Sequence, residues 1–321
     1  MSAAGGTLTG LILSRTGVDR ASAHRGDEAW LAAAWSDPAT RVLVLDRSDA
    51  LVRFGDEADA SLVLVAPGEA PEGVRFLLGV DDSGTVYFGI AGPDGGLGAG
   101  PDPRPGSPLP PSGPGVRPAS LRQVAPLLND RDAGLFTHAV ALAQWHASHT
   151  HCPRCGAPTV PVSAGHARRC TSDGSEHFPR VDPAVIMLVT DDGDRCLLAR
   201  NQNWPPRRVS ILAGFVEPGE SVEQAVAREV SEETGLAVTG IRYVGSQPWP
   251  MPRSLMLGFR AHAPGSQRIS VDEEEIAEAH WFSRDELRAA IGSGEVLLPP
   301  PVSIAHRIIE SWFGQPVPGS W

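Results

Sequence analysis

The sequence predicts an α/β protein of more than one domain, and three observations support this fold class. Apolar runs typical of strands, separated by turns of Gly, Asp and Pro, occupy the first hundred residues. A helical pattern and a cluster of cysteines follow, and a β-hairpin pattern then precedes an amphipathic helix rich in carboxylates. The 321 residues, 41% hydrophobic and 20% charged, suffice for two ordinary globular cores.

The composition excludes several classes of function. All 27 basic residues are arginines, so a Walker lysine, a Schiff-base lysine and a kinase strand lysine are excluded. The net charge of -11 argues against broad binding of duplex nucleic acid, which needs many cationic contacts to phosphates. No run approaches the roughly 18 apolar residues of a membrane helix, and the amino-terminal stretch lacks the basic region of a secretory signal. We therefore expect a cytoplasmic protein without membrane association.

Residues 1–119 are predicted to form a β-rich or α+β N-terminal domain. Its strand-like apolar runs include residues 41–46, 62–66 and 86–91. The domain ends in residues 100–118, where eight prolines and four glycines stand among nineteen residues. This composition predicts a flexible linker rather than a helix or a strand.

Residues 120–182 are predicted to contain helices followed by a zinc-ribbon-like segment. Apolar residues recur at helical spacing before the cysteines, at Leu135, Ala139, Leu142, Ala143 and Trp145. Cys152 and Cys155 then form a C-x-x-C turn, and Cys170 follows fifteen residues later. This spacing is typical of ribbons that hold one tetrahedral zinc ion.

The second cysteine pair of this ribbon is incomplete. Asp173 stands three residues after Cys170, where another cysteine is expected, so the candidates for the missing ligand are Asp173, His166 and His177. A ribbon with free thiols and no metal is the alternative, and a disulfide is less expected in a cytoplasmic chain. A zinc ion held here would be structural, because the ligand set is closed. The remaining cysteine, Cys196, lies in an apolar run and is expected to be buried in a strand.

The third part, residues 183–321, begins with a β-hairpin and continues with a capped helix. Residues 183–190 and 195–200 flank the turn Asp-Asp-Gly-Asp. Ser221 is the predicted N-cap, and the helix ends at Thr234. Gln224 stands at the capping-box position and Gly235 provides the stop. The face that would pack on a sheet contains Val222, Ala225, Val226 and Val230.

Three carboxylates converge on the other face of this helix. Glu229, Glu232 and Glu233 stand at positions i, i+3 and i+4, about one turn apart, where like charges repel. Oxygen ligands of this kind favour Mg or Mn as the compensating cation, whereas a solvated acidic face is the alternative. Arg228 is adjacent, and Glu220, eight residues earlier, is placed to form an ion pair that fixes the loop to the helix.

Residues 214–236 resemble the Nudix box. Every specified position of that pattern agrees: Gly214, Glu220, Arg228, Glu229, Val230, Glu232, Glu233, Gly235 and Leu236. The resemblance implies an α/β/α Nudix sandwich around a mixed sheet, and an enzyme that hydrolyses a nucleoside diphosphate linked to another group. It also implies that Glu229, Glu232 and Glu233 hold the metals, with Glu233 or a neighbouring Glu helping to deprotonate the water. Arg228 and Glu220 complete the implied catalytic set.

Trp249 stands among three prolines in residues 246–252, a second segment that resembles the NADH pyrophosphatase branch of the Nudix superfamily, a family with the capacity to remove NAD caps from RNA. Residues 246–252, SQPWPMP, are similar to the branch signature SQPWPFP, and residues 298–301 match its LPPP stretch. The branch also has a four-cysteine zinc ribbon before the Nudix domain and a β-rich N-terminal domain. Met251 replaces the Phe of the signature, and Asp173 replaces the fourth zinc cysteine, which puts zinc binding in doubt but not catalysis.

This resemblance implies a set of substrate-binding residues. Phe215 and Trp249 would sandwich a nucleotide base, at about 1 to 3 kcal/mol per stacked face, and Phe178 belongs to the same pocket. The positions that contact the AMP portion are Gln247, Ser254 and Ala305. Glu275 matches a further metal-site carboxylate, although an exposed acidic run starting at Asp272 explains it equally well. The branch places the Trp across a dimer interface, so a homodimer with composite sites is implied.

The sequence therefore predicts metal-dependent hydrolysis of the pyrophosphate of NADH or NAD to nicotinamide mononucleotide and AMP, with removal of NAD caps from RNA 5′ ends as a second activity. One alternative is a Nudix hydrolase of another dinucleotide, such as ADP-ribose, FAD or a diadenosine polyphosphate; the Trp249 segment weighs against it. Another is a non-catalytic NAD-binding regulator, but the box carboxylates are all retained. A zinc-ribbon nucleic-acid module is the weakest alternative, because the chain is acidic and the second cysteine pair is broken.

Overall fold

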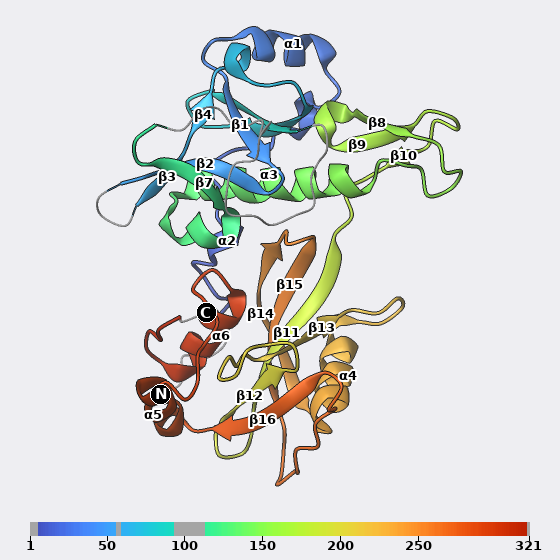
Figure 1. Ribbon diagram of the computed structural model, residues 1–321. Coiled ribbons are helices and arrows are strands. Elements are labelled where there is room, and N and C mark those ends of the chain that lie inside the picture. The colour runs from blue at the N-terminus through green and yellow to red at the C-terminus, as the bar shows by residue number, and fades with distance from the viewer. Residues whose placement is uncertain (1–5, 56–58, 93–112, 320–321) are drawn as a thin grey trace. The chain divides into compact units, whose positions relative to one another are not determined.

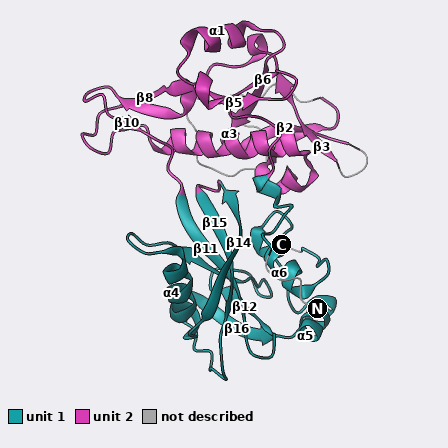
Figure 2. Ribbon diagram, turned by 180° about the vertical axis from the view of Figure 1, so that it is seen from behind, with its two compact units in different colours: residues 1–14, 182–249, 254–321 teal, residues 15–181, 250–253 magenta. Residues whose placement is uncertain are grey.

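The computed structural model describes residues 6–55, 59–92 and 113–319 (Figure 1). The chain forms two compact units (Figure 2). The N-terminal unit comprises residues 15–181 and 250–253, and the C-terminal unit comprises residues 1–14, 182–249 and 254–321. Among the described helices, none is long and apolar enough to cross a membrane.

A seven-stranded sheet forms the centre of the N-terminal unit. The strands lie in the order β3-β2-β1-β6-β5, with β4 paired to β1 and β7 paired to β2. Their bounds are β1 Arg41–Asp46, β2 Asp49–Phe54, β3 Ala60–Leu62, β4 Leu64–Val65, β5 Val74–Val80, β6 Val86–Ala91 and β7 Val116–Ser120. The predicted strands at residues 41–46 and 86–91 are confirmed, and they pair in parallel as β1 and β6.

Helices cover both faces of this sheet (Figure 1). The helices of the unit are α1 Glu28–Ser36, α2 Leu121–Val124 and α3 Asp130–Ser148. On one face, Val42 and Val44 of β1 pack with Ala34 of α1. On the other, α3 packs against β1, β5 and β6, and it buries all the apolar residues predicted for it from helical spacing. Short 3-10 helices of the whole chain lie at Ile12–Ser14, Ser22–His24, Pro67–Glu69, Ala125–Leu127 and Ser163–Gly165.

Part of the predicted linker is a strand. Residues 100–112 of the predicted linker 100–118 lie outside the described residues. Residues 116–118 belong to β7, which pairs antiparallel with β2, so the prediction of an irregular chain is wrong there. Pro118, opposite Leu51, is tolerated because β2 is the one strand neighbour of β7 among the described residues, and a proline at a sheet edge has no N–H to leave unpaired.

The predicted ribbon belongs to the same unit. Its strands β8 Thr159–Val162, β9 Ala167–Cys170 and β10 Glu176–His177 form an antiparallel sheet. The buried Arg168 guanidinium donates to the Thr159 hydroxyl at 2.7 Å, to the Thr159 carbonyl at 2.7 Å, and to Nδ1 of His146 on α3 at 3.0 Å. Because a guanidinium only donates, His146 is neutral, in agreement with burial lowering its pKa to about 4.

A six-stranded mixed sheet forms the centre of the C-terminal unit. The order is β14-β15-β11-β12-β16, and β13 pairs with β11. The bounds are β11 Asp182–Thr190, β12 Cys196–Asn201, β13 Leu212–Phe215, β14 Thr239–Trp249, β15 Ser254–His262 and β16 Ile276–Phe282. β11 runs parallel to β15 and antiparallel to β12, which confirms the predicted hairpin.

Two hydrophobic cores flank this sheet and produce the α/β/α sandwich (Figure 1). The helices are α4 Val222–Thr234, α5 Arg284–Ser293 and α6 Ile304–Phe313. Successive side chains of a strand point to opposite faces. Val185 and Met187 of β11 therefore pack in the core shared with α4, and Ile186 and Leu188 pack in the core shared with α5 and α6. Cys196 is buried in the second core, as expected.

The described residues 6–14 complete the C-terminal unit. Leu11 joins the core of α5 and α6, and the N–H of Leu8 donates to the carbonyl of Val244 at 2.6 Å. In the division into two compact units, residues 15–181 belong to one unit, whereas residues 6–14 belong to the unit that contains residues 182–249 and 254–321. A three-part division into residues 1–119, 120–182 and 183–321 stays a proposal.

Candidate active site

A cavity of about 730 Å³ lies beside α4 in the C-terminal unit. Side chains from β13, the loop before α4, α4 itself, β11, β15 and the loop before β16 surround it. Its lining consists of Ala184, Ala213, Gly214, Phe215, Glu217, Arg228, Glu229, Glu232, Glu233, Ser254, Met256, Asp272 and Glu275. The cavity thus brings together four of the five expected catalytic residues and Glu275, but only two of the six expected substrate-binding residues, Phe215 and Ser254.

Helix α4 begins and ends at the predicted residues. Ser221 Oγ accepts the N–H of Gln224 at 3.2 Å, and Gln224 Oε1 accepts the N–H of Ser221 at 2.9 Å. Gly235, with φ of 69°, adopts the left-handed conformation that ends the helix. Ala225, Val226 and Val230 are fully buried against the sheet, so the carboxylate face is turned toward the cavity.

The Arg228 guanidinium holds the loop, the helix and β13 together. Its Nε and Nη2 donate to the two oxygens of Glu220 at 2.8 and 3.0 Å, which confirms the predicted ion pair. Nη1 donates to Glu229 at 2.9 Å and to Glu232 at 2.8 Å, and Nη2 also reaches the carbonyl of Phe215 at 2.9 Å. The hydrogen bonds from Arg228 hold the pKa of Glu220 below its usual value.

The Glu229 carboxyl lies directly against the backbone of Gly214. A Cβ built on Gly214 would stand 1.9 to 2.2 Å from the three carboxyl atoms of Glu229, closer than any real contact. Because glycine has no side chain, the Glu229 carboxyl can occupy this space beside the backbone. Burial raises the pKa of Glu229, and Arg228 opposes the shift.

Glu233 is the most unusual carboxylate of the cavity. Glu233 is 6% exposed, and its Oε2 has no hydrogen-bond partner in the described structure. Burial, followed by repulsion from Glu229, Glu275 and Glu232, raises its pKa to about 8. A buried, unpartnered carboxylate that titrates near neutral pH is a candidate proton acceptor or ligand.

The loop before β16 closes the cavity against the end of α4. The N–H of Ser270 donates to the Thr234 carbonyl at 2.9 Å, and the N–H of Asp272 donates to the Glu233 carbonyl at 3.2 Å. These bonds satisfy carbonyls that the helix end leaves without partners. They bring Glu275, in an acidic run, to the same cavity as the box residues, which favours the metal-site interpretation over an exposed face.

Two acidic residues of the lining were missed by sequence reasoning. Asp272 opens the acidic run that contains Glu275, and Glu217 lies within the box loop. The acidic run was a signal for Asp272, but which of its members faces the cavity depends on the loop path. Glu217 has its backbone N–H bonded to Glu220 at 3.0 Å, which fixes its place at the cavity edge.

The predicted aromatic residues occupy different places. Phe215 is 59% exposed and lines the cavity, where its ring is available for stacking. Trp249, half-buried, is the last residue of β14 and pairs in register with Ser254, which also lines the cavity. Phe178 belongs to the N-terminal unit and is 68% exposed. Base stacking by Trp249 and Phe178 stays a prediction.

Gln247 and Ala305 are not among the residues lining the cavity. Gln247 is 1% exposed; its Nε2 donates to the Val302 carbonyl at 2.9 Å, and its Oε1 accepts the N–H of Leu13 at 3.3 Å. The Gln247 amide therefore connects β14 by hydrogen bonds to Leu13, near the start of the chain, and to Val302, which follows the prolines 299–301. Ala305 is buried in the first turn of α6. Contacts of both residues with AMP stay predictions.

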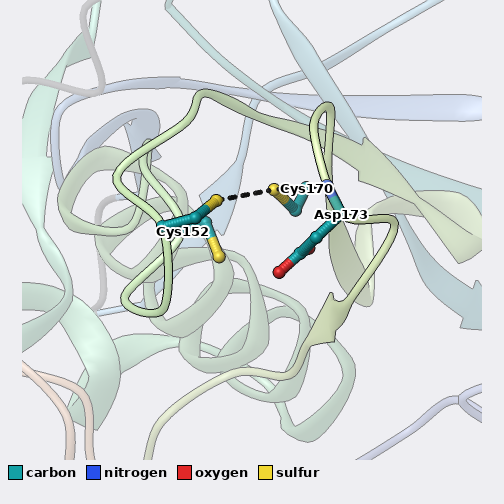
Figure 3. A group of neighbouring side chains, drawn as sticks. Cys152, Cys170 and Asp173 are labelled. Atoms are coloured by element: carbon teal, nitrogen blue, oxygen red, sulfur yellow. Dashed lines mark hydrogen bonds between the residues drawn. The ribbon is translucent and has the colours of Figure 1, made fainter.

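The ribbon forms a separate candidate metal centre in the N-terminal unit (Figure 3). Ligand atoms of Cys152, Cys155, Cys170 and Asp173 all lie within 4.8 Å of one another. His166 lies elsewhere, with its Nε2 at 2.8 Å from the Leu77 carbonyl. The structure thus brings Asp173, rather than His166, to the three cysteines.

Comparison with known proteins decides the family. The NUDIX domain model matches residues 180–298, and the NADH pyrophosphatase zinc ribbon domain model matches residues 147–178. A protein of Mycobacterium bovis named NAD-capped RNA hydrolase NudC is 42% identical over 316 residues, covering 94% of each chain. The chain belongs to the NADH pyrophosphatase branch of the Nudix hydrolase family.

More distant members of the Nudix family match smaller parts of the chain. A Macaca fascicularis protein named NAD-capped RNA hydrolase NUDT12 is 40% identical over 198 residues, which cover 58% of this chain and 43% of the relative. A solved structure of a NUDIX hydrolase from Nitrosomonas europaea is 20% identical and covers 52% of this chain and 95% of its own, with a TM-score of 0.40.

The donor set of this Nudix site fits a divalent cation. Six carboxylates line the cavity, and Arg228 is the one basic residue among the described residues that line it. Oε2 of Glu233 is a buried oxygen without a hydrogen-bond partner in the described structure, and such an oxygen is a candidate ligand. Carboxylate oxygens are the ligands preferred by Mg and Mn.

We expect Gly214→Ala to impair catalysis more than folding. The new Cβ would displace the Glu229 carboxyl, which is the flexible end of a side chain, so the backbone need not move. A displacement of about 1 Å at a catalytic group costs on the order of 100-fold in kcat/KM. Steady-state kinetics with NADH and a thermal unfolding curve check this. Unchanged kinetics would contradict the role assigned to the contact with Gly214.

A second expectation concerns how the free energy of unfolding depends on pH when a metal chelator is present. Glu233 has a pKa of about 8 when folded and an ordinary value of 4.5, so between these pH values only the folded chain keeps the proton. The free energy of unfolding should therefore fall as pH rises through this window, by at most about 1.4 kcal/mol per pH unit. Urea unfolding of wild type and Glu233→Gln should show a shallower fall in the variant; identical slopes would contradict a buried, protonated Glu233.

Proposed function

We propose that this Nudix hydrolase cleaves the pyrophosphate of NADH and NAD, releasing nicotinamide mononucleotide and AMP. The observation that carries the proposal is the meeting of four candidate metal ligands with the exposed ring of Phe215 in one cavity. These ligands are Glu229, Glu232, Glu233 and Glu275. A dinucleotide pyrophosphate presents the two matching features, an anionic centre and a flat base.

The four carboxylates are proposed to hold Mg or Mn. Such an ion, when bound, would neutralise the pyrophosphate and lower the pKa of a water that attacks phosphorus. Glu233 is the proposed proton acceptor, because burial and the neighbouring carboxylates raise its pKa to about 8, close to neutral pH. Ligation of a cation by one carboxylate oxygen would lower this pKa and keep the group ionised, so that the other oxygen could accept the proton.

Arg228 and Glu220 act in this proposal as positioning residues. The guanidinium of Arg228 is occupied by three carboxylates and one carbonyl, so it holds Glu229 and Glu232 in place. Glu220 accepts both hydrogen bonds of the fork, which fixes the plane of the guanidinium. Arg228 thus links Glu229 and Glu232 to the backbone of Phe215.

Removal of NAD caps from RNA 5′ ends is proposed as a second activity. Its support is the name of the Mycobacterium bovis relative, NAD-capped RNA hydrolase, together with coverage of nearly the whole of both chains. The reaction at the pyrophosphate is the same, since the RNA continues from the adenosine of the cap. The acidic net charge of -11 gives no independent support for long contacts with RNA.

We also propose a homodimer with composite sites. Phe178 carries an exposed ring, 68% accessible in a single chain, and Trp249 remains half-buried at the end of β14. Large exposed aromatic side chains are typical of binding and association surfaces. A second copy that covers these rings would complete a base-binding pocket.

The two alternative functions require different features of the cavity. A hydrolase of ADP-ribose, FAD or a diadenosine polyphosphate would share the carboxylates, so only the substrate preference separates it from our proposal. A silent NAD-binding regulator would not need the buried, unpartnered Glu233 or the arginine clamp. The complete and assembled carboxylate set favours catalysis.

We expect Glu233→Gln to abolish the turnover of NADH while leaving nucleotide binding intact. The amide keeps the size of the side chain but accepts no proton and ligates a cation poorly, which typically costs about 100- to 10,000-fold in rate. Turnover is checked by measuring the products formed from NADH with Mn or Mg. Nucleotide binding is checked by calorimetry with NAD.

The matched control is Glu223→Gln on the same helix. Glu223 is exposed and does not line the cavity, so its loss should leave kcat within about twofold. Normal turnover in Glu233→Gln would contradict the mechanism, whereas equal losses in both variants would point to a general charge effect.

A further inference from the structure

The metal centre of the ribbon departs from the four-cysteine pattern, and its geometry says what replaces the missing cysteine. We propose that Asp173 is the fourth ligand of a zinc ion held by Cys152, Cys155 and Cys170, and that Ser175 orients its carboxylate. The inference does not depend on the reaction catalysed in the C-terminal unit.

The first ligand turn shows the geometry of a metal-binding knuckle. The N–H of Cys152 donates to the Ala157 carbonyl at 2.8 Å, and the Cys152 carbonyl accepts the N–H of Gly156 at 2.9 Å. Gly156 has φ of 73°, a left-handed conformation that favours glycine. Cys155, one residue before this glycine, is thereby turned back toward Cys152.

The second turn repeats this arrangement bond for bond. The N–H of Cys170 donates to the Ser175 carbonyl at 2.9 Å, and the Cys170 carbonyl accepts the N–H of Gly174 at 3.2 Å. Gly174 has φ of 71°. Asp173 therefore occupies in the second turn the position that Cys155 occupies in the first, and its side chain is directed to the same point (Figure 3).

Both turns also direct backbone donors at a sulfur. The N–H groups of Ser172 and Asp173 lie 3.4 and 3.5 Å from Sγ of Cys170. The N–H groups of Arg154 and Cys155 donate in the same way to Sγ of Cys152. Such donors stabilise a thiolate, which is the form that ligates zinc.

The separation of the sulfurs matches a tetrahedral ion. Sγ of Cys155 and Sγ of Cys170 are 3.5 Å apart, too far for a disulfide bond. A tetrahedron with Zn–S bonds of about 2.3 Å has edges of about 3.8 Å. A small adjustment of either side chain would therefore admit the ion.

Ser175 fixes the Asp173 carboxylate in the orientation of a ligand. Oδ1 of Asp173 accepts the backbone N–H of Ser175 at 2.9 Å and its hydroxyl at 2.6 Å. Asp173 also hydrogen-bonds the Cys170 thiol, so the carboxylate faces the sulfurs. An outer partner that holds one oxygen of a carboxylate while another ligates is the usual support of a metal ligand.

His177 is the competing ligand. Its Nε2 lies 3.2 Å from Oγ of Ser175, and it hydrogen-bonds Sγ of Cys152. It is not part of the group whose ligand atoms lie within 4.8 Å of one another. The experiment must therefore separate Asp173 from His177.

A carboxylate in this position predicts a weaker centre than four thiolates would form. Zinc prefers soft thiolate donors, and oxygen is harder. Cys152 and Cys170 are buried, whereas Cys155 and Asp173 are exposed, so the oxygen ligand lies on the solvent side of the ion. We expect the zinc of this chain to be exchangeable by a chelator, and Asp173→Cys to hold it more tightly.

The test uses the full chain loaded with zinc or with cobalt. Zinc content by elemental analysis, transfer to a chromophoric chelator, and the cobalt-thiolate absorption are measured for wild type, Asp173→Cys, Asp173→Asn, Ser175→Ala and His177→Gln. Glu176→Gln is the matched control, since Glu176 is exposed, pairs with Arg169 and is not in the candidate ligand group.

We expect one zinc per chain in wild type and in the control. Asp173→Asn should lower the affinity by at least about 100-fold, and Ser175→Ala by about 10-fold, as for the loss of an outer partner. Asp173→Cys should raise it and add a fourth cobalt-thiolate bond to the absorption. His177→Gln should behave as wild type.

Three results would overturn the proposal. Wild-type affinity in Asp173→Asn would show that the carboxylate is not a ligand. Loss of zinc in His177→Gln, with retention in Asp173→Asn, would assign the ligand to His177. Zinc binding by Asp173→Cys alone would show that the aspartate abolished the site. If Asp173→Asn fails to fold, wild-type affinity in His177→Gln together with higher affinity in Asp173→Cys supports the proposal, and loss of zinc in His177→Gln overturns it.

Discussion

The hydrogen bonds of one arginine determine the geometry of the acidic cavity. Arg228 stands on α4 and reaches Glu220 in the preceding loop, Glu229 and Glu232 on its own helix, and the carbonyl of Phe215 at the end of β13. The guanidinium is planar and always charged, and it offers five donors in a fixed fork, so it can hold several acceptors at once. Lysine, which this chain does not use at all, would provide a single point charge.

The same cavity concentrates more negative charge than the arginine compensates. Glu233 is buried without a partner for Oε2, and Glu229 is buried against Gly214. Folding without a cation therefore works against repulsion among carboxylates, which protonation of Glu233 relieves in part. A divalent ion bound to the folded chain would relieve it further, so metal binding and stability are coupled. Burial of these carboxylates costs free energy of folding, and this cost favours the binding of an ion.

Local signals in the sequence predicted the catalytic helix to the residue. Ser221, Gln224 and Gly235 specify where α4 starts and ends because caps act on the nearest turns, and the spacing of the glutamates specifies their common face. The ion pair of Glu220 with Arg228 was equally local. The mixed sheet of the sandwich followed from the resemblance to the Nudix box rather than from strand patterns.

Long-range contacts account for what the sequence did not predict. Asp272 joins the cavity because its loop bonds to the end of α4, and no residue pattern encodes that path. Gln247 lies in the interior because Leu13, 234 residues away along the chain, and Val302, 55 residues away, supply partners for its amide. The strand at residues 116–118 depends on β2, which overrides the proline-rich composition. Such pairings are set by tertiary structure.

The central claim is that the assembled carboxylates hydrolyse the pyrophosphate of NAD(H). Chromatographic analysis of the products formed from NADH, NAD, ADP-ribose and a short NAD-capped RNA, each with Mg or Mn, tests it most directly. The account predicts nicotinamide mononucleotide with AMP from the free dinucleotides, and nicotinamide mononucleotide with a 5′-monophosphate end from the RNA. Binding of NAD without cleavage of any of these compounds would contradict it and indicate a regulator.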